Sequence, residues 1–166
     1  MKNVISIVVK NNSSVLARIS SLFGRRGFNI DSLSVSATDD PHISRITVVA
    51  QSDQSGLAQI ISQTQKLEET ISVRALDENL SVFRELSLVK ILTTDENFFD
   101  KFAIELSDKY GAIIVDVTAK SMILELTGTS DKIDSFMSEL SAAQEEKHYV
   151  ISKVCRTGIT AIERGV

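Results

Sequence analysis

Amide and hydroxyl side chains gather in one short stretch of the chain, between a predicted strand and a predicted helix. The stretch holds Asn11, Asn12, Ser13 and Ser14, and the helix begins at Val15. The first N–H groups of a helix have no acceptor within it, so a small carboxylate would bind here. The alternative is an ordinary helix cap, because Asn and Ser are common at that position.

A second polar group lies at the other end of the same predicted helix. Asn29 could hold an amino group through its side-chain amide and carbonyl, while Ile30, Val15 and Leu16 could supply an apolar wall. In a βαββαβ fold these two ends are too far apart for one subunit to enclose a small molecule. The site would therefore need a symmetric pair of subunits. Asn29 could also be no more than a turn residue.

Other kinds of site find little support in the sequence. There is no G-x-S-x-G elbow, Cys155 is the only cysteine, and His42 and His148 lack partners at metal-ligand spacing. Asp39, Asp40 and His42 could share a hard cation, but Asp and Pro in this stretch are more typical of a hairpin turn. We therefore expect no catalytic residue, no metal site and no cofactor in this chain.

Composition and charge restrict the function further. The chain has 166 residues and a formal net charge of −4, with 8 basic and 8 acidic residues up to position 78 and 10 against 14 after it. A nucleic-acid surface would need an excess of basic residues on one face. No apolar run approaches the roughly 20 residues of a membrane span, and Met1 leads straight into a strand without a secretory signal. We expect a cytoplasmic protein that contacts neither nucleic acid nor membrane.

The hydrophobic pattern predicts a βαββαβ order in residues 1–78. Segments in which every second residue is apolar alternate with segments whose apolar residues recur at helical spacing, and Asp53 or Ser55 would cap the second helix. The predicted elements are centred on residues 4–9 (strand), 15–23 (helix), 32–37 and 46–50 (a hairpin), 57–64 (helix) and 71–75 (strand).

The same order returns between residues 84 and 154. A helix capped near Asp95 would carry Phe98, Phe99 and Phe102, and Ser130 would cap a later helix. The residues Ile113, Val115 and Val117 are expected to pair with Met122, Leu124 and Leu126.

The fold class is therefore α+β, with two tandem ferredoxin-like βαββαβ modules. Both helices of a module lie on one face of its sheet, so the other face is left open. That face of the first sheet would carry Val4 and Val8, and covering it calls for another sheet or subunit. We expect a homodimer.

Eight segments along the chain, taken together and in their order, resemble the small, regulatory subunit of acetolactate synthase (acetohydroxyacid synthase). The resemblance covers essentially the whole chain. They are Asn11 to Arg18, Arg26 to Leu33, Thr38 to Pro41, Ser44 to Thr47, Leu88 to Lys90, Asp116 to Thr118, Glu125 to Thr129 and Arg156 to Gly158.

The resemblance implies an ACT domain in residues 1–78, which binds an effector and dimerises, and a C-terminal ferredoxin-like domain in residues 79–166. Such a subunit is not an enzyme itself. It would bind a separate catalytic subunit, which carries thiamine diphosphate, magnesium and FAD, and would raise its activity in branched-chain amino acid (valine, leucine and isoleucine) biosynthesis. Valine would act as feedback inhibitor at the ACT dimer interface. The implied effector-binding residues are Asn11, Ser13, Ser14, Val15 and Leu16 from one subunit and Asn29 and Ile30 from its neighbour.

The chain departs from the family pattern at Ser14, where members that respond to valine usually have glycine. A glycine lets backbone N–H groups approach a ligand without a Cβ in the way. Ser14 would narrow or reshape the pocket, or it could cap the helix and donate to the carboxylate.

Two other functions compete with this one. A stand-alone ACT-domain amino-acid sensor would control a different enzyme or a transporter. An acylphosphatase-like enzyme would need an arginine in its anion-binding loop, whereas Arg18 lies inside the helix. The segment from Arg156 to Val166 is either a closure of the second module or a partner contact.

Overall fold

The computed structural model describes residues 1–93, 105–144 and 148–165. They form two compact units. The first comprises Met1–Phe83 together with the end of the chain from Gly158 onward, and the second comprises Arg84–Thr157. The division falls five residues after the expected boundary at 78, and the last residues belong to the first unit rather than the second.

The first unit contains a four-stranded antiparallel sheet with the strand order β2-β3-β1-β4. This is the order of a ferredoxin-like fold, and it confirms the α+β prediction. The elements are β1 (Lys2–Lys10), α1 (Val15–Arg25), β2 (Ile30–Ala37), β3 (Ile43–Gln51), α2 (Gln54–Gln65) and β4 (Thr70–Leu76).

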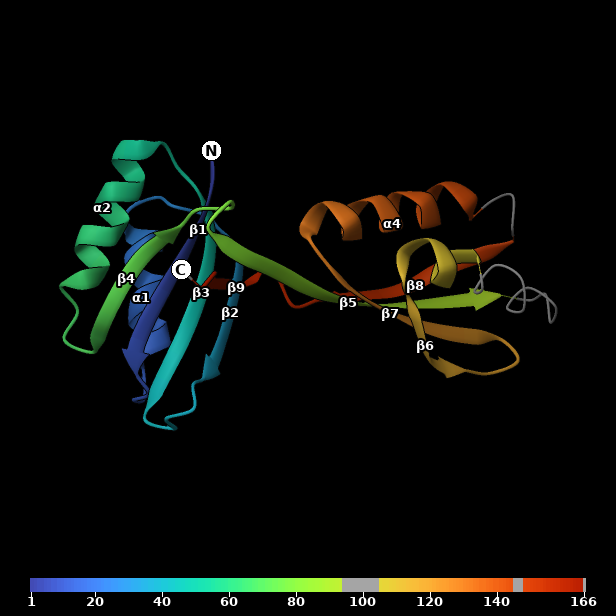
Figure 1. The fold of residues 1–166 in the computed structure, drawn as a ribbon, viewed down its shortest axis with the longest axis horizontal. Helices are drawn as coiled ribbons and strands as arrows, with labels where there is room; N and C mark the ends of the chain where they lie inside the picture. The colour runs from blue at the N-terminus through green and yellow to red at the C-terminus, as the bar shows by residue number, and fades with distance from the viewer. Residues whose placement is uncertain (94–104, 145–147, 166) are drawn as a thin grey trace. The chain divides into compact units, whose positions relative to one another are not determined.

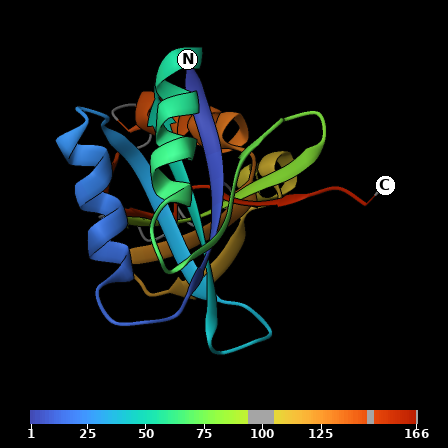
Figure 2. The same ribbon diagram turned by 90° about the vertical axis from the view of Figure 1, so that its left-hand side faces the viewer.

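Both helices of this unit cover the same face of the sheet (Figures 1 and 2). Alternate residues of β1 and β3 point toward them, and the helical stripe of α1 packs on these residues through Ile19 and Phe23, both fully buried. Of the two caps that the sequence allowed, Asp53 and not Ser55 caps α2, by accepting a hydrogen bond from the Gly56 N–H at 2.7 Å. Gly27 ends the α1 region with a φ of 73°.

The opposite face of the first sheet is partly covered by the chain itself, which corrects one expectation. Val4 is only 7% exposed, because Ile159 and Ala161 from the end of the chain pack on it together with Val49. The short strand β9 (Thr160–Glu163) pairs with the start of β5 (Ser81–Thr93). Val4 therefore does not require a second subunit for its burial. Figure 1 shows this segment, in red, on the first unit.

The second unit repeats the arrangement with the strand order β6-β7-β5-β8. Its core lies between the sheet and α4, with Val89, Leu124 and Phe136 fully buried. The further elements are β6 (Ile113–Val117), β7 (Ser121–Gly128), α4 (Ser130–Ala143) and β8 (Tyr149–Arg156), and residues 105–110 are also helical. The predicted cap at Asp95 and the phenylalanines that follow it lie outside the described residues.

One local prediction in the second unit was wrong, and another was right only in part. Thr129, not Ser130, caps α4 by accepting from the Lys132 N–H. The strands β6 and β7 pair as expected, and Val117 is opposite Met122. A bulge between Ile114 and Asp116 shifts the register beyond that point, so Ile113 is opposite Glu125 and Ile114 is opposite Leu124.

Candidate functional site

The loop between β1 and α1 is held to the hairpin between β2 and β3 by Asn11. Its backbone N–H donates to the His42 carbonyl at 2.7 Å, and its side-chain Nδ2 donates to the Pro41 carbonyl at 2.9 Å. The Asn11 amide nitrogen is thus used to fix the loop. Asn12, Ser13 and Ser14 are exposed and border the N-terminus of α1.

Ser14 has an unusual backbone conformation for a residue with a side chain. Its φ is 68° and its ψ is −2°, in the left-handed region, and its hydroxyl makes no capping hydrogen bond to the helix. Glycine is favoured there because a Cβ costs about 1–2 kcal/mol. Ser14 therefore does not cap the helix, which was one of the two roles that the sequence allowed. It also occupies a backbone conformation that glycine would adopt at a lower cost in free energy.

The N-terminus of α1 leaves backbone donors available. The Arg18 N–H reaches the Ser14 carbonyl at 3.0 Å, and this is the first regular helical bond of α1. The amides of Leu16 and Ala17 precede it and have no acceptor within the helix. Beside them, the Leu16 side chain is 39% exposed, whereas Val15 is 5% exposed and belongs to the core. Of the apolar residues predicted here, Leu16 is the one placed to touch a ligand.

Arg18 is not available as an anion ligand. Its Nη1 lies 2.5 Å from Oε1 of Glu69, whose side chain is only 11% exposed. The ion pair ties α1 to the residue just before β4. This geometry counts against an acylphosphatase-like anion site.

Asn29 and Ile30 lie at the far end of α1, at the entry to β2. The Asn29 Nδ2 donates to Oδ1 of Asp31 at 3.0 Å, and Oδ2 of Asp31 accepts from Gln51 at 3.2 Å. Asn29 and Asp31 are exposed, and Ile30 is half-buried. Sequence reasoning missed Asp31, although its i, i+2 spacing from Asn29 puts both on one side of an extended chain.

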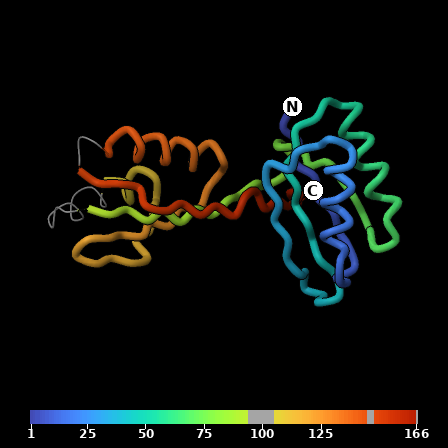
Figure 3. The backbone as a smooth tube through the Cα atoms, turned by 180° about the vertical axis from the view of Figure 1, so that it is seen from behind, coloured from blue at the N-terminus to red at the C-terminus, as the bar shows by residue number. Residues whose placement is uncertain are grey.

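The structure keeps the two groups of predicted residues apart within one chain. Lys10, which precedes the loop, pairs with Ile43 at one end of β3, whereas Ile30 pairs with Ala50 near the other end. Seven residues of strand span about 23 Å. Figure 3 shows the two connections at opposite ends of α1, so a single chain does not close a site between them.

The predicted metal alternative at the β2–β3 hairpin is not supported. Oδ1 of Asp40 accepts from the His42 N–H at 2.8 Å, and the Asp40 N–H donates to Thr38. These are turn-forming bonds. Across the described residues, no group of three or more His, Cys, Asp or Glu side chains is placed to hold a metal ion. No helix in the described part of the chain is long and apolar enough to cross a membrane.

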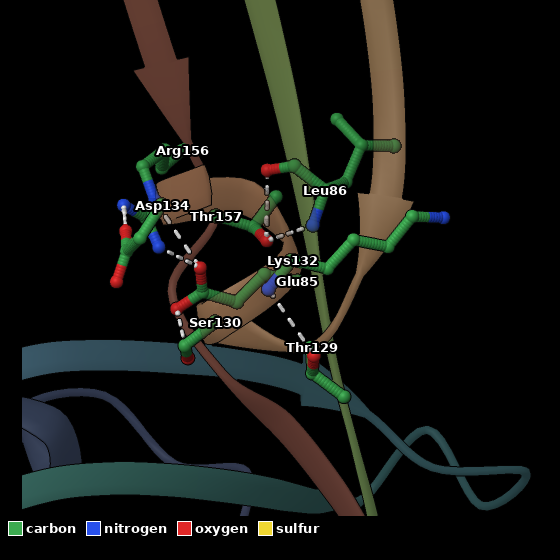
Figure 4. A network of polar contacts seen from close by, with 8 residues as sticks. All are labelled: Glu85, Leu86, Thr129, Ser130, Lys132, Asp134, Arg156 and Thr157. Carbon is green, nitrogen blue, oxygen red and sulfur yellow. Dashed lines mark hydrogen bonds and ion pairs between the residues drawn. The ribbon is translucent and has the colours of Figure 1, made fainter. Parts of the chain in front are cut away.

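A polar network in the second unit explains one segment whose role the sequence left open (Figure 4). Arg156, at the end of β8, forms ion pairs with Glu85 on β5 and with Asp134 on α4, the latter at 2.6 Å. Burial lowers the pKa of Arg156, but the hydrogen bonds to both carboxylates outweigh it, so the pKa is raised. Thr157 adds a hydrogen bond from its backbone N–H to the Leu86 carbonyl at 3.0 Å. Arg156 and Thr157 thus close the second unit.

The comparisons with known proteins agree along the whole chain. Residues 5–72 match the model of the AHAS small subunit-like ACT domain, and residues 84–165 match the model of the small subunit of acetolactate synthase. A "Probable acetolactate synthase small subunit" of Archaeoglobus fulgidus is 40% identical, over 99% of this chain and 98% of that protein. The acetolactate synthase small subunit of Haemophilus influenzae is 38% identical, over 99% of this chain and 97% of that protein.

A solved structure gives the same result. The crystal structure of an acetolactate synthase small subunit from Thermotoga maritima matches with a TM-score of 0.85 and 32% identity, covering 100% of this chain and 99% of that one.

Proposed function

The chain belongs to the acetolactate synthase small-subunit family, and we propose on this basis that it regulates a separate catalytic subunit in branched-chain amino acid biosynthesis. It would raise the activity of that subunit and mediate feedback inhibition by valine. Thiamine diphosphate, magnesium and FAD belong to the catalytic partner in this proposal, and this chain contributes no catalytic group.

The observation that carries the proposal is the half-site at each end of α1. β2 is an edge strand of the first sheet, and Val35 on it is 44% exposed. Two copies that pair edge to edge through antiparallel β2 strands are related by a two-fold axis, which reverses the direction of one copy. The Asn11 end of one copy then lies beside the Asn29 end of the other. The pair forms two equivalent sites, each with residues from both chains.

The chemistry of such a site fits a small apolar amino acid. The free amides of Leu16 and Ala17, at the positive end of the α1 dipole, would bind the carboxylate. The carbonyl oxygen of Asn29 and the carboxylate of Asp31 would bind the ammonium group. Leu16 and Ile30 would contact an aliphatic side chain.

Regulation follows from linkage between this site and the catalytic subunit. Valine bound across two copies orders their pairing, and a catalytic state that prefers or avoids this ordered pair changes its population accordingly. A coupling of about 1–3 kcal/mol is enough for a fivefold to 150-fold effect.

Calorimetric titration of valine into the full-length chain tests the site. We expect binding that Asn29→Ala weakens by about tenfold to 100-fold, because hydrogen bonds to charged groups contribute about 1.5–3 kcal/mol. Asn79→Ala, in the exposed turn before β5, is the matched control and should bind as the unchanged chain does. No heat at millimolar valine, or an Asn29→Ala variant that binds normally, would contradict the site.

A mixing experiment tests its shared composition. Leu16→Arg blocks one half-site and Asn29→Ala the other, so neither variant alone has an intact site. In a mixed pair, one of the two sites combines the intact halves. Mixing equal amounts should therefore restore roughly a quarter of the sites. Absence of any recovery would show that the two halves do not come from different chains.

A further inference from the structure

The face of the second sheet that points away from α4 is apolar at its centre and exposed. Alternation along β5 directs Val89 and Ile91 into the core, while Leu88 and Leu92 point to the other side, each 36% exposed. By register, Ile123 of β7, Ile113 of β6 and Val150 of β8 share this side. Ile113 is 59% exposed and Val150 57%. We call this surface the open face of the second sheet.

Charged residues on the open face are sorted by sign across the strands. Lys90 on β5 and Lys153 on β8 are register partners, so two positively charged side chains start from adjacent positions on this face. Asp116 on β6 and Glu125 on β7 lie on the opposite half of the sheet. None of these four side chains forms an ion pair with another described residue. Like charges on neighbouring strands are unfavourable unless something compensates them.

We propose that the open face binds the open face of a second copy, with a two-fold axis that runs parallel to the strands between β5 and β7. This rotation places the basic half of each sheet over the acidic half of the other. Lys153 then faces Asp116 of the second copy, because both belong to one row of the register through Lys90 and Ile123. An axis across the strands would place lysine over lysine.

The charge pattern favours a second copy over a different protein. A partner with a patch of one sign would satisfy one half of the open face and repel the other, whereas the face itself carries the complementary pattern. Stacking would also remove Leu88, Leu92 and Ile123 from water at the centre of the contact. This contact is distinct from the edge pairing of the first unit, and it requires no bound amino acid.

The single cysteine provides a direct test in the full-length chain. Cys155 is exposed on the open face and shares a register row with Ile113, three strand spacings away, about 14 Å. In the stacked pair, Cys155 of one copy faces Ile113 of the other. The Ile113→Cys variant, treated with a short bismaleimide, should therefore give a covalent dimer. The same distance prevents a bridge within one chain.

Two controls define the geometry. Ile114→Cys places a thiol on the other side of the sheet, because Ile114 is the register partner of the core residue Leu124, and it should give no dimer. The unchanged chain should give none either, since its two Cys155 thiols lie at opposite edges of the stack. A dimer from the unchanged chain would mean that two β8 edges meet, and this would overturn the proposal, as would the absence of a dimer from Ile113→Cys.

Charge reversal tests the direction of the axis. In the Ile113→Cys background, Lys153→Asp should slow dimer formation by at least about tenfold, because it places like charges together. Adding Asp116→Lys should restore it, whereas Asp108→Lys, on the helical side of the unit, should have no effect. Failure of the double reversal to restore the dimer would overturn the proposed axis. A covalent adduct with added catalytic subunit in place of the dimer would assign the face to that partner instead.

Discussion

The contact of the chain's end with the first unit predicts a strong and specific effect of Gly158→Ala. Gly158 has a φ of +72°, and a methyl group there would lie 2.7 Å from Cβ and 2.8 Å from Oγ of Ser32. The left-handed conformation costs a residue with a Cβ about 1–2 kcal/mol, and overpacking costs about 1–3 kcal/mol. Allowing for the stiffer unfolded chain, which offsets about 0.4–1 kcal/mol, we expect a loss of about 2–4 kcal/mol.

Hydrogen exchange of the segment from Ile159 to Gly165 measures this loss, because detachment of the segment relieves both the strain and the clash. The Arg164 N–H donates to the Leu80 carbonyl at 2.9 Å and reports the attached state. Exchange in Gly158→Ala should be faster by a factor of about 30 to 1,000, since each 1.4 kcal/mol is tenfold. Gly165→Ala is the matched control, because a methyl group there meets nothing within 4 Å.

A double-mutant cycle separates the clash from the strain. Ser32→Gly removes both close atoms, so the clash disappears in the double variant while the backbone strain remains. The double variant should therefore be less destabilised than the sum of the single variants, by about 1–3 kcal/mol. Additive effects, or unchanged exchange in Gly158→Ala, would refute the contact between Gly158 and Ser32.

Three further predictions concern single residues. Ser14→Gly should raise the free energy of unfolding by about 0.5–1 kcal/mol in urea titration, because relief of the left-handed strain exceeds the added freedom of the unfolded chain, and an unchanged or lower value would contradict the strain. Arg156→Met should destabilise the second unit by about 2–3 kcal/mol, because it leaves the nearly buried Glu85 carboxylate with the Ser130 hydroxyl but without a cation. Arg156→Met combined with Glu85→Leu should cost less than Arg156→Met alone, and a double loss equal to the sum of the two single losses would mean that the pair is not coupled. Burial raises the pKa of Tyr149 to about 12. The unfolded chain therefore loses the phenolic proton at a lower pH than the folded chain, and the free energy of unfolding should fall between about pH 10 and pH 12. Tyr149→Phe should remove this part of the alkaline loss in a pH series of unfolding curves, and a variant with the same pH profile as the unchanged chain would contradict the shifted pKa.

The fold was predictable where the signals are local. Period-two alternation and helical stripes place the strands and helices of the first unit, and Asp53, one of the two caps that the sequence allowed, begins α2. The position of β9 was not predictable. Its residues Thr160–Glu163 form a four-residue strand, too short for a periodic signal, and the burial of Ala161 depends on Val4 and Val49, more than 100 positions away in the chain.

The candidate site was predictable in its parts but not in its details. The sequence places Asn11 and Asn29 at opposite ends of one helix, and the structure agrees. It does not reveal that the Asn11 amide nitrogen is used by Pro41, that Ser14 is left-handed, or that Asp31 accompanies Asn29. These features depend on tertiary contacts and on backbone angles, which residue type alone does not determine.

Acetolactate formation by the catalytic subunit, measured while the full-length chain is titrated in, tests the regulatory role most directly. We predict that the rate rises to a plateau as the two subunits associate, and that valine then lowers it, with a weaker effect in Asn29→Ala than in Asn79→Ala. A rate that does not change on addition of the chain, with or without valine, would contradict the role assigned to this protein.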